Sequence, residues 1–104
     1  MKQIRVFISQ PMRDRSNEEI KEERRKIMAN LASIMPNSEI IIIDSFFKDA
    51  PHEAKPLWFL GESFKLLSTA DLAVFAEGWE KARGCRLEHE ATISYNINRI
   101  YITK

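Results

Sequence analysis

The chain has 104 residues and a mass of 12.1 kDa, which is enough for one compact domain over residues 1–104 and too little for two. Hydrophobic residues make up 44% of it and charged residues 30%, which is typical of globular proteins rather than disordered or fibrous ones. The 16 Lys and Arg against 15 Asp and Glu give a net charge of +1. A chain this close to neutral has no general attraction for polyanions, so we expect neither nucleic acid nor a membrane as its partner.

The apolar runs of the sequence are short. Ile40–Ile43 is far below the roughly 20 residues that a membrane-spanning helix needs. The stretch Ile4–Ile8 is shorter than the core of a secretion signal, which has about 7 to 15 residues. The single cysteine, Cys85, excludes an intramolecular disulfide and a cysteine-based zinc site. We therefore expect a cytoplasmic protein.

The first third of the chain has the pattern of a strand followed by a helix. Ile4–Ile8 is mainly β-branched and aromatic, which predicts a strand that ends before Pro11. The segment Ser16–Glu19 has the form of a capping box, in which the serine hydroxyl and the glutamate carboxylate bind the first free amides of a helix. Apolar residues then recur at helical spacing until Pro36, so residues 17–35 are predicted to form one amphipathic helix. We interpret its charged face as ordinary solvated surface.

The middle of the chain predicts a second strand and helix. Ile40–Ile43 is an unbroken β-branched run, which favours a strand covered on both faces as in parallel sheets. Pro56 is suited to the first position of the helix expected over 57–68. The apolar arc of that helix covers about half of its circumference, more than the roughly 100° that one core contact needs. We therefore expect the chain to form a homo-oligomer through helix 57–68.

The last third adds a strand over 71–76, a helix over 87–95 that opens near Arg83 and Gly84, and a short strand over 100–102. Strands that are apolar throughout and alternate with helices indicate an α/β fold. We expect a single-domain, doubly wound parallel sheet of about four to five strands, like that of flavodoxins and Rossmann folds, in three α/β/α layers with right-handed crossovers.

In such sheets ligands bind beyond the carboxyl ends of the strands, near the point where strand order reverses. This rule selects the loops Ser9–Arg13, Asp44–Phe47 and Glu77–Glu88. The stretch Gly78–Glu90 around the third loop gathers three acids, two arginines, a histidine and a tryptophan beside a strand end, which few pure scaffolds would do. Arg83 and Gly84, at a predicted helix start, offer a guanidinium and backbone amides to an anionic group.

Three other groups in the sequence have more ordinary explanations. Cys85, at a helix start, is better explained as a small packing residue than as a nucleophile, since no histidine is evidently placed to activate it. His52 with Asp49 and Glu53 has spacing too loose for a metal site, so we expect no metal and no cofactor. The Ser9 loop lacks the glycines of a dinucleotide fingerprint or a P-loop.

Two motifs carry a family resemblance. The chain reads F-I-S-Q-P-M after the first predicted strand and A-D-L-A-V-F-A-E-G-W-E-K-A-R-G-C-R-L-E-H-E-A in its C-terminal half. These segments resemble the nucleoside 2-deoxyribosyltransferase-like superfamily, and more closely a branch of small bacterial and phage proteins with the pattern S-G-P-M, G-W-E and R-G-x-x-L-E. The resemblance spans nearly the whole chain and implies the doubly wound sheet already expected from periodicity.

The resemblance also implies roles for particular residues. By motif position Glu88 is the nucleophile that attacks the anomeric carbon of a deoxynucleoside and forms a covalent glycosyl ester, chemistry that suits a carboxylate because the transition state resembles an oxocarbenium ion. Trp79, which follows Gly78, would stack on the nucleobase. Asp44 and Glu90 are the candidates for a proton to the leaving base. The loop of Ser9, Gln10, Pro11 and Met12 would approach the sugar or its 5′ end, and Gly78, Trp79, Arg83 and Gly84 complete the expected binding residues.

This chain departs from the family pattern at two positions. It has Ala82 where transferases of the family often have an aspartate, and Gln10 where a glycine is usual. Four functions therefore stay open: transfer of a deoxyribosyl group between bases; hydrolysis of a deoxynucleoside, its monophosphate or another nucleotide such as a nicotinamide dinucleotide; binding or sensing of a nucleotide without turnover; and a purely structural role in an oligomer. The ordinary explanation of Glu88, a helix-start acid stabilised by the helix dipole, also stays open.

Overall fold

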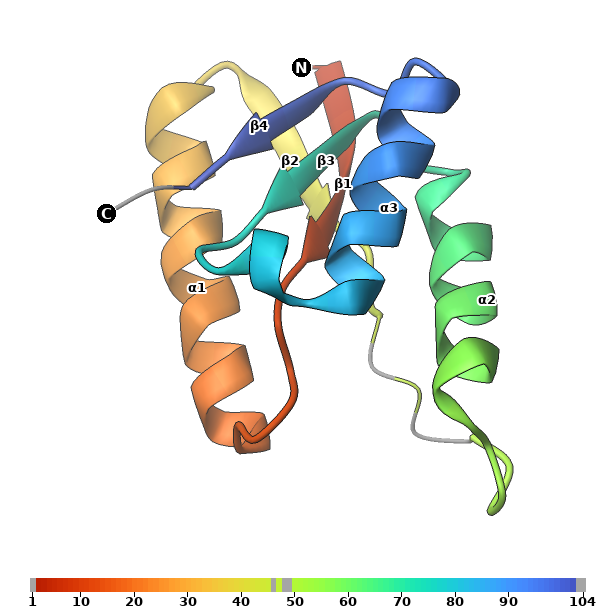
Figure 1. Ribbon diagram of the computed structural model, residues 1–104. Coiled ribbons are helices and arrows are strands. Elements are labelled where there is room, and N and C mark those ends of the chain that lie inside the picture. The colour runs from red at the N-terminus through yellow and green to blue at the C-terminus, as the bar shows by residue number, and fades with distance from the viewer. Residues whose placement is uncertain (1, 46, 48–49, 103–104) are drawn as a thin grey trace.

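The computed structural model describes residues 2–45, 47 and 50–102 of the chain. Strands and helices alternate along it, as the sequence predicts (Figure 1). The elements are β1 (Lys2–Ser9), α1 (Asn17–Ile34), β2 (Ser38–Ile42), α2 (Pro56–Leu67), β3 (Leu72–Phe75), the short 3-10 helix η1 (Trp79–Lys81), α3 (Arg83–Ser94) and β4 (Arg99–Tyr101).

The four strands form one parallel sheet in the order β2-β1-β3-β4. The chain passes from β1 to β2 in one direction and then returns across β1 to add β3 and β4 on the other side. Strand order therefore reverses between β1 and β3, whose last residues, Ser9 and Phe75, pair in register. In open parallel sheets a crevice forms at this reversal.

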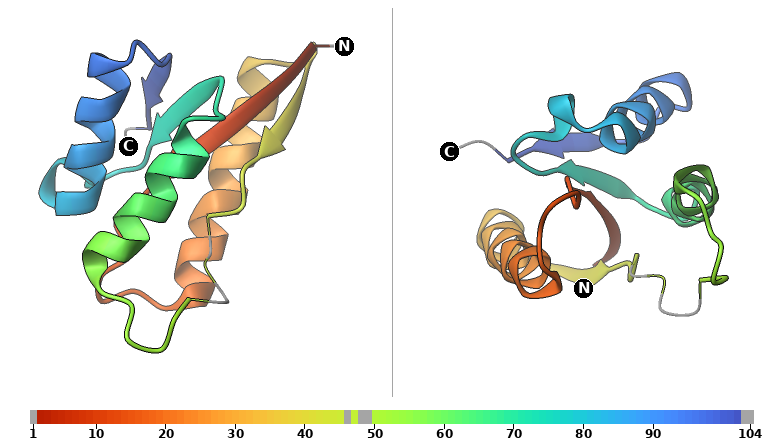
Figure 2. Two further views of the ribbon diagram at one scale, coloured as in Figure 1. Left: turned by 90° about the vertical axis from the view of Figure 1, so that its right-hand side faces the viewer. Right: turned by 60° about the horizontal axis from the view of Figure 1, so that its bottom comes forward.

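Helices cover both faces of the sheet, with α1 on one face and α2 and α3 on the other (Figure 2). Because side chains alternate along a strand, Val6 and Ile8 of β1 pack with Leu31 of α1, whereas Phe7 packs with Leu67 of α2. Each face of the sheet thus has its own hydrophobic core. The doubly wound, three-layer α/β/α fold expected from the sequence is confirmed.

Local signals in the sequence set the helix starts. The capping box of α1 is present: the Ser16 hydroxyl accepts a hydrogen bond from the Glu19 amide, and the Glu19 carboxylate accepts one from the Ser16 amide, each at 3.1 Å. α2 begins at Pro56, whose fixed backbone angle suits a first helical residue. Among the helices that the structure describes, none combines the length and the apolar character needed to cross a bilayer.

The run Ile40–Ile43 predicted a strand covered on both faces, and its side chains reach both cores: Ile40 and Ile42 pack against the core under α1, and Ile43 lies in the core under α2. The coverage is partial, because β2 lies at an edge of the sheet with a neighbouring strand on one side only, and Ile40–Ile42 are half-buried. Only Ile43, just after the strand, is fully buried, in the core under α2.

The two cores anchor the helices that carry the polar residues of the site. We expect Leu31→Ala, which empties a fully buried position in the core under α1, to lower the free energy of unfolding by about 2 to 5 kcal/mol. Urea denaturation of the purified variants measures this. Ile34→Ala, on the same helix at a residue that is 60% exposed, is the matched control and should change stability by about 0.5 kcal/mol or less. Equal effects of the two variants would contradict this packing.

α2 presents apolar side chains to solvent: Leu57, Phe59 and Phe64 are all exposed, and Leu67 is the one fully buried residue of this helix. We expect the purified chain to form a homo-oligomer through this helix, and we expect Leu57→Glu to shift it toward the 12.1 kDa monomer, because a charge would then enter an apolar contact. Ile93→Glu, at an exposed residue of α3, is the control. Light scattering after size-exclusion chromatography measures the mass, and a monomeric wild type would contradict the prediction.

Candidate active site

A cleft of about 1090 Å³ lies at the carboxyl ends of the strands, at the crevice that the strand reversal predicts. It is lined by the loop after β1, the loop after β2, the first half of α2 and the segment from η1 into α3. Most of the residues expected from the sequence line this cleft: Gln10, Pro11, Met12, Gly78, Arg83, Gly84 and Glu88. Four segments that are distant in the sequence therefore meet in one cavity.

Glu88 lies in the second turn of α3, beside the end of β1. Its side chain is only 8% exposed, and its Oε1 accepts a hydrogen bond of 2.6 Å from the Ser9 hydroxyl, the last residue of β1. Burial raises the pKa of the Glu88 carboxyl above its ordinary value, and hydrogen bonding from Ser9 and Ser63 and the charge of Arg24 oppose that rise. A surface acid that only stabilises a helix start would not be buried in this way, so the structure favours a site residue.

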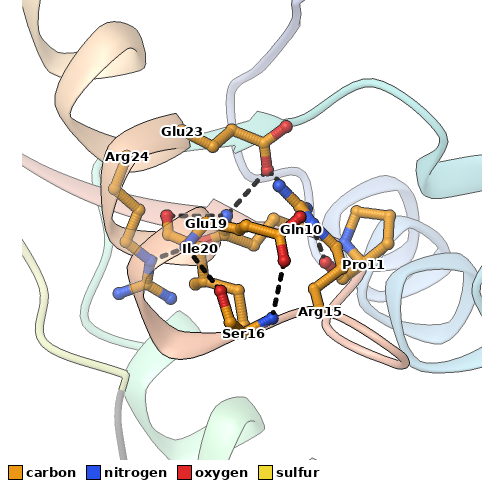
Figure 3. A network of polar contacts seen from close by, with 8 residues as sticks. All are labelled: Gln10, Pro11, Arg15, Ser16, Glu19, Ile20, Glu23 and Arg24. Carbon is orange, nitrogen blue, oxygen red and sulfur yellow. Dashed lines mark hydrogen bonds and ion pairs between the residues drawn. The ribbon is translucent and has the colours of Figure 1, made fainter.

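Gln10 follows Ser9 and turns its side chain toward α1 (Figure 3). Its amide nitrogen donates to the Glu23 carboxylate at 2.7 Å and to the Ile20 carbonyl at 3.3 Å. Its amide oxygen accepts from the Arg24 guanidinium. Gln10 is therefore buried and fully engaged, although it also forms part of the cleft wall.

Arg24 joins the loops that follow β1 and β2. Besides Gln10, its guanidinium binds the hydroxyl of Ser45, and the carboxylates of Asp44, Glu23 and Glu88 all favour its charged form. Burial lowers the pKa of Arg24, but these three carboxylates counteract that effect. One half-buried cation thus links two loops and a buried acid at the same end of the sheet.

Arg15 adds a second cation to this network. It forms an ion pair with Glu23 at 2.9 Å and donates to the Pro11 carbonyl at 2.8 Å (Figure 3). The segment from Gln10 to Arg15 is therefore tied to α1 at both of its ends. The interpretation of the α1 charges as solvated surface was wrong for Glu23, which accepts from Gln10 and Arg15 together.

Three residues expected in the site do not line the cleft: Ser9, which is buried and bound to Glu88, Trp79 and Asp44. Trp79 stacks on His89, with 4.2 Å between ring centroids, and packs at 5.4 Å from Phe75. His89 in turn shares a 2.6 Å hydrogen bond with the Tyr101 hydroxyl. The expectation that Trp79 would stack on a ligand is therefore corrected, because the tryptophan joins β3, α3 and β4. Asp44 is exposed after β2 and acts on Arg24 rather than lining the cleft.

The aromatic wall of the cleft comes from another part of the chain. Phe47 and Phe59 both line it, with 6.1 Å between their ring centroids, and Trp58 packs behind them at 5.1 Å from Phe59. The sequence predicted that the apolar arc of helix 57–68 serves the core and a contact between subunits, and Phe59 instead lines the cleft. A broad apolar arc on 57–68 was the signal in the sequence, since it left room for a second contact besides the core.

Cys85 is buried beside the site rather than reactive within it. Burial raises the pKa of its thiol to about 11, and the Glu88 charge adds to the rise. The thiol is therefore protonated at neutral pH, as expected for a packing residue. No cluster of three metal-ligating side chains occurs in the part of the chain that the structure describes. Asp49, one member of the loose His52 group, lies outside the described residues.

Comparisons of the chain with models of known protein families, with curated proteins and with solved structures find no match.

The buried Glu88 carboxyl makes stability depend on pH. Its pKa in the folded chain lies above the ordinary value of 4.5, so folding favours the protonated form. The contribution of the protonated carboxyl to the free energy of unfolding is lost as the pH rises through the folded-state pKa. We expect Glu88→Gln to be more stable than wild type at pH 8, and the difference to shrink toward pH 4. Thermal unfolding at a series of pH values measures it.

Glu90→Gln, at an exposed residue of the same helix, is the control and should show no such pH dependence. A Glu88→Gln variant that is less stable than wild type at pH 8 and equal to it at pH 4 would reverse the sign and contradict the assigned burial cost.

Proposed function

We propose that this chain cleaves the N-glycosidic bond of a 2′-deoxynucleoside or its monophosphate, with Glu88 as the nucleophile. The observation that carries the proposal is a carboxylate buried at the strand reversal, facing a cleft and held by Ser9 at 2.6 Å. Such a group is dry, fixed in direction and within reach of a bound ligand, as covalent catalysis requires. The resemblance to deoxyribosyltransferase-like proteins supports the same assignment.

The chemistry balances with groups of this chain. A lone pair of the Glu88 carboxylate forms a bond to the anomeric carbon while the C–N bond breaks, and the electrons of that bond leave with the base, which takes up a proton. Water or a second base then attacks the glycosyl ester and restores the carboxylate. Only the ionised form of Glu88 can act, and the Ser9 hydroxyl and the Arg24 charge favour that form.

Asp44, which the sequence offered as the donor of the proton that the departing base takes up, is exposed and does not line the cleft. In this proposal the base therefore takes its proton from water. Glu90 is exposed and bound by the Ser94 hydroxyl at 3.2 Å, which places it on the outer side of α3. We also keep the cytoplasmic location as a prediction.

A second function has its own support. Glu88 is the only carboxylic residue among the described residues that line the cleft, and Ala82 lines it where the family pattern often has an aspartate. A site with one carboxylate can bind a nucleotide without turning it over. Such a module would bind ligand with saturation and release no free base on prolonged incubation.

The decisive measurement is chromatography of free base after incubation with deoxynucleosides, their monophosphates and nicotinamide dinucleotides. We expect wild type to release base from at least one substrate, and Glu88→Gln to lose at least about a hundredfold in rate, the scale of removing a covalent nucleophile. Glu39→Gln, at the other end of the sheet on β2, should keep the wild-type rate. Binding without release by wild type would select the binding module instead.

A further inference from the structure

The walls of the cleft carry far more positive charge than the chain as a whole. Glu88 is the one acidic residue among its described lining residues, against five basic ones: Arg13, Arg15, Lys81, Arg83 and Arg86. The whole chain, by contrast, has a net charge of +1. Arg15 is neutralised by its ion pair with Glu23, which leaves four basic side chains facing one buried carboxylate.

The acids of this end of the molecule are gathered in a different place. A second groove, of about 600 Å³, lies along α1 on the other side of the sheet. Its charged lining residues are five acids, Glu18, Glu19, Glu22, Glu23 and Glu77, and two bases, Arg15 and Lys26. The groove along α1 is therefore mainly acidic, and the cleft that holds Glu88 is mainly basic. A cleft with one sign of charge and low-dielectric walls concentrates ligands of the opposite sign.

The basic and aromatic residues come from different walls of the cleft. Lys81, Arg83 and Arg86 come from η1 and the start of α3, and Arg13 from the loop after β1. The wall formed by the loop after β2 and by α2 carries Phe47 and Phe59 instead. Glu88 contacts both sides, since it lies on α3 and is influenced by Ser63 of α2. The cleft is thus aromatic on one side, basic on the other and carboxylic between them.

We infer that the ligand of this cleft carries a phosphate group, bound by Arg13 and Arg83, and that its base lies against Phe47 and Phe59. This inference rests on the proposed function and narrows its substrate to a deoxynucleoside monophosphate. A guanidinium gives two parallel hydrogen bonds to phosphate oxygens. The positive charge of the guanidinium also offsets the repulsion between a phosphate and the Glu88 carboxylate. An uncharged nucleoside would need no such compensation.

Binding to the Glu88→Gln variant tests this without turnover. Calorimetry compares each deoxynucleoside with its 5′-monophosphate, and 2-deoxyribose with 2-deoxyribose 5-phosphate, which removes any dependence on the base. We expect the phosphorylated member of each pair to bind at least tenfold tighter at low salt. Adding Arg13→Gln or Arg83→Gln to the Glu88→Gln variant should remove most of the tighter binding of the phosphorylated ligands. The affinity for the nucleosides should stay within about twofold of that of Glu88→Gln alone.

Arg25→Gln, on the solvent-facing side of α1 and paired with Glu22, is the control with the same change in charge and should keep the advantage. Circular dichroism confirms that each variant is folded. Equal affinity for both members of every pair, equal losses in Arg25→Gln and Arg83→Gln, or no binding of any probe would each overturn the phosphate site. If wild type releases base from nucleosides but not from monophosphates, the inference fails and the proposed function stands. If phosphate binding depends on the arginines but wild type releases no base, the phosphate site stands and the proposed function fails.

Discussion

The cost of burying one carboxylate organises this end of the molecule. Glu88 is buried at the strand reversal, and an isolated charge there would be expensive. The Ser9 hydroxyl, Ser63 and the charge of Arg24 lower that cost, and Arg24 can do so only because Gln10 and Ser45 hold its guanidinium in place. The need to stabilise the buried Glu88 carboxylate therefore constrains three segments together: the end of β1, the first half of α1 and the loop after β2.

Much of the fold was readable from the sequence because its signals are local. The capping box at Ser16, the proline at Pro56 and the apolar runs of the strands each depend on neighbours a few residues away, and the elements appear where those patterns predict them. The position of Glu88 could also be anticipated, since a helix that follows a buried strand brings its first turns to the sheet edge. The partial exposure of β2 could not be anticipated, because it follows from the position of β2 at the sheet edge. That position depends on strand order and not on the run Ile40–Ile43.

The partners of the site residues were harder to predict. Arg24 belongs to a helix face whose charges alternate in sign, and such a face is usually solvated. Nothing in that local pattern says that a loop 14 residues earlier in the chain supplies an amide that draws one arginine inward. Trp79 failed for a similar reason. A tryptophan in a loop suggested a ligand, but His89, ten residues later, provides its stacking partner instead. Long-range pairs of this kind leave no periodic trace in a sequence.

The contacts of Gln10 restrict which side chains can occupy its position. Its nitrogen must donate to a carboxylate while its oxygen accepts from a guanidinium, so a primary amide fits and a carboxylate does not. A glycine at position 10 would leave Glu23 and Arg24 without this bridging amide. Substitution of either residue would then cost less stability. Positions 10, 23 and 24 are consequently coupled through one amide group, and among relatives of this chain we expect them to change together or not at all.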